Sequence, residues 1–212
     1  MFDIAGTIRE ISILAVPFLL AITCHEAAHG YAAYLLGDPT AKMAGRLTLN
    51  PLRHLDPLGT LALILTRMIG WAKPVPVDPR YFKNPQRDMM LVSIAGPAAN
   101  MLLAIMFAVV LNVLLGLDIR GYSETTLTIL EPTAIISKAG VIINLALCFF
   151  NLLPIPPLDG SKIIAGFLPR ETAYKFMSFR YGFIIVIVLA MLGLLGKTIS
   201  PAISFFYNLL IF

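Results

Sequence analysis

Two histidines and a glutamate stand within five residues of one another in this chain, in a His-Glu-Ala-Ala-His sequence at positions 25–29. On a helix, residues four apart share one face, so His25 and His29 can bind the same metal ion. Imidazole nitrogen is a preferred zinc ligand, and Glu26 beside the metal can act as a base toward water. The motif therefore predicts a zinc-dependent hydrolytic centre.

The motif lies inside an apolar segment of a very apolar chain. Hydrophobic residues make up 58% of its 212 residues and charged residues only 13%, whereas a soluble domain carries about 25% charged residues. The composition indicates an integral membrane protein in a lipid bilayer. We expect no nucleic-acid partner despite the net charge of +4, because membrane proteins collect Lys and Arg in their cytoplasmic loops.

The metal motif must therefore be positioned by transmembrane helices. We expect an all-α polytopic membrane protein with about four to six transmembrane helices, forming a single domain over residues 1–212. Because the first apolar segment itself carries the motif, we do not expect it to be a removable signal peptide. The predicted spans cover residues 8–36, 88–117, 133–153 and 181–195, and the apolar end at 199–212 is only marginally long enough to cross.

A polar loop rich in proline and glycine, residues 40–87, follows the motif helix. Its apolar run at 58–68 is too short to span a bilayer comfortably, which favours a re-entrant or interfacial segment. At 71–77, prolines alternate with valines, a pattern that favours an extended edge strand or a β-hairpin over a helix. We therefore predict a re-entrant or β-hairpin loop directly after the motif helix.

Basic residues predict how the chain is oriented. The loops at 37–87 and 154–180 hold twelve of the sixteen Lys and Arg residues, and such loops face the cytoplasm. The metal motif then lies toward the cytoplasmic side of the membrane. Water from the cytosol can reach it there.

A third protein ligand is expected, because catalytic zinc sites usually supply three and leave one position for water. Asp159 follows the proline-rich segment 154–157 at the end of the third predicted span, and Gly160 lets the chain turn its carboxylate back into the bundle. On spacing alone, a helix cap is the alternative role for Asp159. The candidates for the third metal ligand are His54, Asp56, Asp118, Glu131 and Asp159. For His54, in a juxtamembrane turn, we favour a role in loop structure or in supporting a metal ligand.

A second motif, Asn-x-x-Pro-x-Pro-x-x-Asp-Gly, occupies residues 151–160. With the His-Glu-x-x-His motif, and with the stretches at 50–59 and 95–100, it closely resembles the site-2 protease family of intramembrane zinc metalloproteases. The resemblance is to compact prokaryotic-type members without PDZ or CBS domains.

The resemblance implies that Asp159 is the third ligand of one zinc ion per chain, beside His25 and His29, and that Glu26 is the general base. It also implies that Asn151 stabilises the developing oxyanion or the substrate backbone. The extended segment at 71–77 would pair with an unwound substrate. Substrates would be transmembrane or membrane-anchored proteins of a prokaryotic cell membrane, with a separate regulatory or adaptor protein as a further partner. Asn100 remains open between helix packing and lining of the cleft.

Two other functions would use the same metal ligands. A membrane zinc protease of the kind that trims prenylated proteins also carries His-Glu-x-x-His, but usually takes a distal Glu as its third ligand. A metal transporter would place the ligands along a permeation path, usually across inverted repeats. We find no such repeat in the sequence, so intramembrane proteolysis is the favoured prediction.

Overall fold

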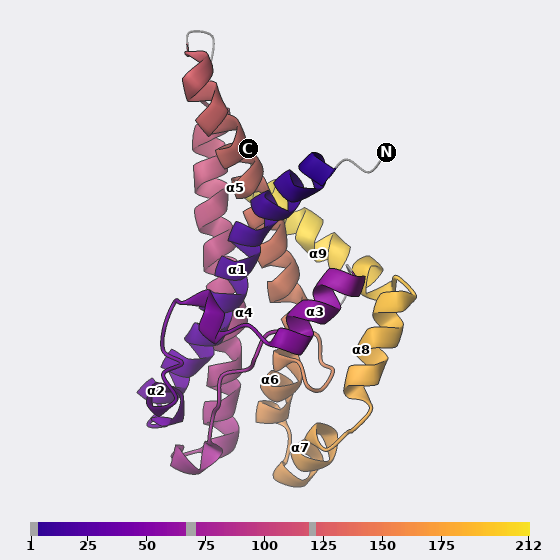
Figure 1. The fold of residues 1–212 in the computed structure, drawn as a ribbon. Helices are drawn as coiled ribbons and strands as arrows, with labels where there is room; N and C mark the ends of the chain where they lie inside the picture. Colours follow the sequence, from indigo (N-terminus) through magenta and orange to yellow (C-terminus); the bar gives the residue numbers. More distant parts are fainter. Residues whose placement is uncertain (1–3, 67–70, 119–121) are drawn as a thin grey trace.

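Three long helices form the centre of the molecule. The computed structural model describes residues 4–66, 71–118 and 122–212. Within them, α1 (Ile4–Leu35), α4 (Pro85–Leu115) and α5 (Glu124–Asn151) pack together (Figure 1). Each contains a segment long and apolar enough to cross a bilayer, and the pair α7 (Arg170–Met177) and α8 (Gly182–Met191), bent by 55°, makes a fourth span if counted as one. The chain is an all-α polytopic membrane protein, as predicted, with three candidate spans, or four if the bent pair is counted as one, against the predicted four to six.

Small residues allow α4 and α5 to approach each other closely. Ala104 and Ala108 of α4 pack with Val141 and Leu145 of α5 in a buried cluster, as expected where helices associate without water. Aromatic side chains of the last helix, α9 (Leu194–Leu210), pack against this cluster. Its 17 residues extend about 26 Å, somewhat less than the hydrocarbon core of a typical bilayer.

The helix α5 begins earlier than the predicted span, which started at residue 133. Ser123 caps it by accepting a hydrogen bond from the Thr126 amide, and the helix continues through Pro132. A proline removes one backbone hydrogen bond from a helix, but here it does not mark the helix boundary. At the other end α5 stops at Asn151, before the proline-rich segment, as predicted.

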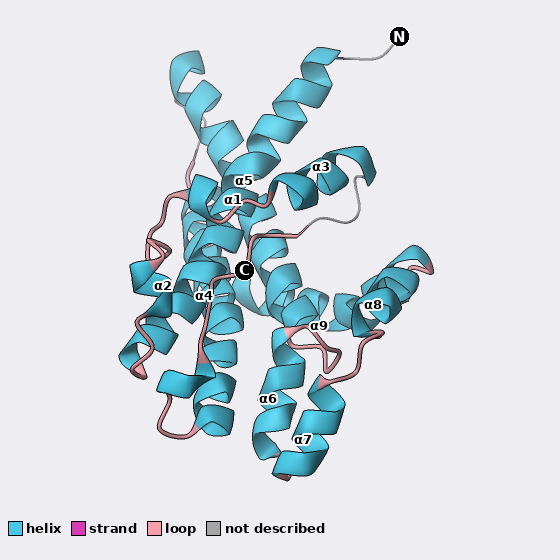
Figure 2. Ribbon diagram, turned by 60° about the horizontal axis from the view of Figure 1, so that its bottom comes forward, coloured by secondary structure: helices cyan, strands magenta, loops and turns pink. Residues whose placement is uncertain are grey.

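The loop after α1 contains the short helices α2 (Thr40–Met43), η1 (Pro51–Arg53), α3 (Pro57–Thr66) and η2 (Pro79–Tyr81). The predicted apolar run at 58–68 forms α3, and its last two residues lie outside the described residues. Residues 71–78 are extended and run back along the bundle to the start of α4 (Figure 2). Within the described ranges there is no β-strand, and one isolated antiparallel bridge joins Leu55 to Ala72. The loop therefore forms a short helix followed by an extended segment. The β-hairpin, one of the two predicted forms, is not found within the described residues.

The helix α6 (Asp159–Phe167) begins against the end of α5. A Cβ atom on Gly160 would lie 2.2 Å from the carbonyl oxygen of Leu152, so only glycine fits there. The prediction that Gly160 serves a turn was therefore wrong: the residue is helical and permits a close approach. The close approach of α6 to the end of α5 goes with a position of Asp159 beside α1, where it contacts His25 and His29.

Candidate metal centre

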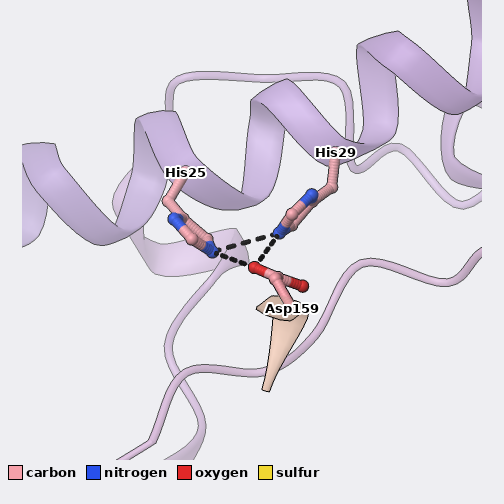
Figure 3. A group of neighbouring side chains, drawn as sticks. All are labelled: His25, His29 and Asp159. Carbon is pink, nitrogen blue, oxygen red and sulfur yellow. Dashed lines mark hydrogen bonds and ion pairs between the residues drawn. The ribbon is translucent and has the colours of Figure 1, made fainter. Parts of the chain in front are cut away.

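His25, His29 and Asp159 point toward one another from α1 and α6 (Figure 3). The two Nε2 atoms lie 3.0 Å apart, and Asp159 Oδ2 lies 3.1 Å from that of His25 and 3.0 Å from that of His29. Ligands about 2.0–2.1 Å from a tetrahedral zinc ion are separated by about 3.3 Å. The three atoms therefore have nearly the spacing of one zinc coordination sphere.

The other ring nitrogen of each histidine has a partner that accepts a hydrogen bond. His29 Nδ1 lies 2.7 Å from the carbonyl oxygen of Val92, which can only accept, so Nδ1 carries the proton. His25 Nδ1 lies 2.6 Å from Oδ1 of Asn100, and the amide nitrogen of Asn100 lies 3.1 Å from the carbonyl oxygen of Ala21, which fixes the orientation of that amide. In its neutral form, each imidazole then presents an unprotonated Nε2 to the centre.

This arrangement of lone pairs fits a bound cation. Two unprotonated imidazole nitrogens 3.0 Å apart, beside a carboxylate oxygen, repel one another unless a positive charge lies between them. Two nitrogen donors and one oxygen donor also form a ligand set typical of catalytic zinc. In the part of the chain that the structure describes, no other group of three His, Cys, Asp or Glu residues has donor atoms this close together.

Asp159 is 5% exposed, and Lys162 donates a hydrogen bond to its Oδ1 at 3.2 Å. The ammonium group of Lys162 favours the ionised form of this carboxyl group. Asp159 is therefore an anion at neutral pH. One carboxylate oxygen faces the histidines and the other faces Lys162.

Gly96 of α4 leaves room for the rings of His25 and His29. A Cβ atom at this position would lie 2.5 Å from Nε2 of His29 and 2.6 Å from Cε1 of His25. Any side chain there would displace both rings. Gly96 thus allows α4 to lie directly against the face of α1 that carries His25 and His29.

Glu26 is held by the extended segment that follows α3. Its Oε2 accepts a hydrogen bond from the amide N–H of Val75 at 2.8 Å. Val75 stands between Pro74 and Pro76, neither of which has an amide hydrogen. A Cβ atom on Gly30, one turn after Glu26, would lie 3.2 Å from the side chain of Val75, so the segment lies close against α1.

The remaining predicted residues lie outside this cluster. Asn151 donates a hydrogen bond to the carbonyl oxygen of Leu147 within α5. His54 is fully buried, and its Nε2 lies 2.9 Å from the carbonyl oxygen of Thr48, within the loop. Asp56 accepts a hydrogen bond from the Gly59 amide in the first turn of α3.

Two asparagines near the centre were not assigned from the sequence. The role of Asn100 was left open, and the structure places it against His25. Asn144 was missed, although its amide accepts a hydrogen bond from Asn100 at 3.0 Å. The available signal was an amide in the middle of an apolar helix, which requires a partner.

Comparisons with known proteins identify relatives of this chain. The model of peptidase family M50 matches residues 125–195. YwhC of Bacillus subtilis, named as a candidate zinc metalloprotease, is 42% identical over 90% of this chain and 85% of its own length. Rip2 of Mycolicibacterium smegmatis, named in the same way, is 29% identical over 96% of this chain and 78% of its own length. No solved structure gives a significant match.

Proposed function

The chain belongs to peptidase family M50 and is an intramembrane zinc metalloprotease, and from this premise we propose that His25, His29 and Asp159 bind its catalytic zinc, one ion per chain. The observation that carries the assignment is the convergence of the two Nε2 atoms and one carboxylate oxygen within 3.1 Å of one another. When bound, zinc supplies a Lewis acid that polarises a peptide carbonyl and activates water.

Glu26 is the general base of the proposed reaction. It precedes His29 by three positions on α1, a spacing that makes the two side chains neighbours on the helix surface. Its other oxygen accepts a proton from the attacking water and passes this proton to the nitrogen of the leaving amine. The N–H of Val75, bonded to Oε2, keeps the carboxylate in place while it does so.

Asn151 is proposed to stabilise the oxyanion or the substrate backbone. Its position at the last residue of α5, just before the segment that leads to Asp159, supports this role. Its amide must exchange the hydrogen bond to Leu147 for one to the substrate. Cleavage by Asn151→Ala should therefore fall with zinc content unchanged, and undiminished cleavage would refute the role.

Membrane proteins within the bilayer are the substrates of such an enzyme. We infer more narrowly that the substrates are transmembrane or membrane-anchored proteins of a prokaryotic cell membrane, that the zinc site lies toward the cytoplasm, and that a separate protein regulates cleavage. The bacterial relatives support the first part, and the basic loops support the orientation. Nothing in the comparisons supports a metal transporter or a protease for prenylated proteins.

Zinc analysis of purified variants tests the ligand assignment. Wild-type protein should contain about one zinc ion per chain, and Asp159→Ala should bind zinc at least about 100-fold more weakly, since even partners of zinc ligands contribute 10–100-fold. Asp56→Ala is the matched control, because it removes an aspartate whose carboxylate bonds the Gly59 amide at the start of α3. Zinc bound at wild-type affinity by Asp159→Ala would overturn the assignment.

A further inference from the structure

A buried series of hydrogen bonds crosses the bundle and ends at His25. His25 Nδ1 donates to Asn100 Oδ1 at 2.6 Å, and the amide nitrogen of Asn100 donates to Asn144 Oδ1 at 3.0 Å. Asn144 in turn donates to the carbonyl oxygen of Gly140 in its own helix at 2.9 Å. Both asparagines are 0% exposed. The series therefore joins α1, α4 and α5 away from water.

The direction of this series is set at two points by backbone carbonyl groups, which can only accept. The amide nitrogen of Asn100 donates both to the carbonyl oxygen of Ala21 and to Asn144. If the Asn100 amide turned over, its oxygen would face two other acceptors. Asn144 cannot turn over to relieve one of these contacts, because its nitrogen is held by Gly140. In a buried site, such unpaired acceptors are costly.

The orientation of Asn100 decides which nitrogen of His25 is available to a metal. While Oδ1 of Asn100 accepts, the imidazole proton stays on Nδ1, and Nε2 keeps its lone pair toward His29 and Asp159. With the amide reversed, the proton would move to Nε2. That nitrogen could then not bind a cation.

We propose that Asn144, acting through Asn100, is a positioning residue that holds His25 in the tautomer and ring orientation required for metal binding. This inference rests on the proposed function, in which His25 is a zinc ligand, and extends it to a residue on a third helix. Asn144 bonds Asn100 and its own helix. Its effect on the metal is therefore indirect, as for other residues that orient a ligating histidine.

The test compares zinc affinity among matched variants, measured by competition with a chromogenic chelator. Asn144→Leu removes the acceptor for Asn100 and should weaken zinc binding by about 10-fold or more. Asn144→Ala removes the same acceptor without adding bulk and carries the same expectation. Asn144→Asp keeps an acceptor oxygen at this position and should bind zinc within about threefold of wild type.

Asn112→Leu is the control for loss of an amide within the membrane. Asn112 lies on α4, about three turns from Asn100, and donates to the carbonyl oxygen of Leu210 at 2.7 Å. Its replacement can lower stability but should leave zinc affinity unchanged. The absorption spectrum of the cobalt-substituted protein, which reports ligand geometry, should change for Asn144→Leu and not for Asn112→Leu.

The outcomes separate this inference from the function on which it rests. Wild-type zinc affinity and an unchanged cobalt spectrum in both Asn144→Leu and Asn144→Ala would overturn the role of Asn144 and leave the zinc site intact. A lower thermal stability with unchanged zinc affinity would also overturn it, because a purely structural residue behaves in that way. Zinc bound at full affinity by His25→Ala would instead refute the ligand assignment itself.

Discussion

At the scale of single residues, the site depends on which lone pairs remain free. The side-chain amide of Asn100 and the backbone carbonyl of Val92 accept hydrogen bonds from Nδ1 of His25 and of His29. Lys162 donates a hydrogen bond to one oxygen of Asp159. What remains is a set of donor atoms directed at one point. The same principle applies to Glu26, where the Val75 N–H bonds one oxygen and the other oxygen is the one proposed to transfer the proton.

The contact between Glu26 and Val75 can be removed without touching a side chain of the centre. Val75→Pro deletes the amide N–H that bonds Oε2 of Glu26. Hydrogen bonds to charged groups contribute about 1.5–3 kcal/mol, so the cleavage rate should fall by about 10-fold or more while zinc content stays the same. Val75→Ala keeps the N–H and serves as the control. Equal cleavage rates for these two variants would count against a positioning role for the Val75 amide.

The side chains of the centre were predictable from the sequence and the backbone atoms that hold them were not. His25, Glu26 and His29 have residue types and a spacing that carry zinc chemistry, whereas Asp159 was assigned from the resemblance carried by the motif at 151–160. The partners at Val75 and Val92 are a backbone N–H and a backbone carbonyl, which every non-proline residue possesses, so no residue type marks them.

At the scale of helices, the centre depends on how closely α4 lies against α1. Gly96 leaves room for both imidazole rings, and the carbonyl oxygen of Val92, about one turn away on the same helix, holds His29. The close packing of these helices and the geometry of the ligands are therefore linked.

Gly96→Ala tests this link. The added methyl group would lie 2.5 Å from the ring of His29, so the rings must move, and we expect zinc affinity to fall by about 10-fold or more. Gly196→Ala in α9 is the control, because a Cβ atom there has no neighbour within 4 Å, and it should be neutral or slightly stabilising. Zinc affinity equal to that of wild type in Gly96→Ala would contradict the account.

Helix positions were predicted better than helix ends. Hydropathy located the spans of α1, α4 and α5, because any segment within a bilayer must be long and apolar. The start of α5 was missed because the Ser123 cap lies in a polar segment that hydropathy ignores. An extended segment was predicted at 71–77 from its prolines, whereas its contact with Glu26 depends on tertiary packing against Gly30.

At the scale of the whole molecule, the basic loops that carry α2, α6 and α7 lie at one end of the bundle (Figure 1). We expect this end to face the cytoplasm. A membrane-impermeant maleimide should then label Lys175→Cys, exposed on α7, only from the cytoplasmic face of vesicles. It should label Tyr122→Cys, just before α5, only from the other face, with the unsubstituted chain as the background control. The reverse pattern would refute the proposed orientation.

The central claim is that a zinc ion held by His25, His29 and Asp159 acts together with Glu26 as base. Its most direct test measures cleavage of single-span membrane proteins in liposomes by wild type and by Glu26→Gln, with bound zinc quantified in both. We predict equal zinc content and a rate at least about 100-fold lower for Glu26→Gln, the loss expected for a general base. Cleavage by Glu26→Gln at the wild-type rate, with zinc bound, would contradict the account.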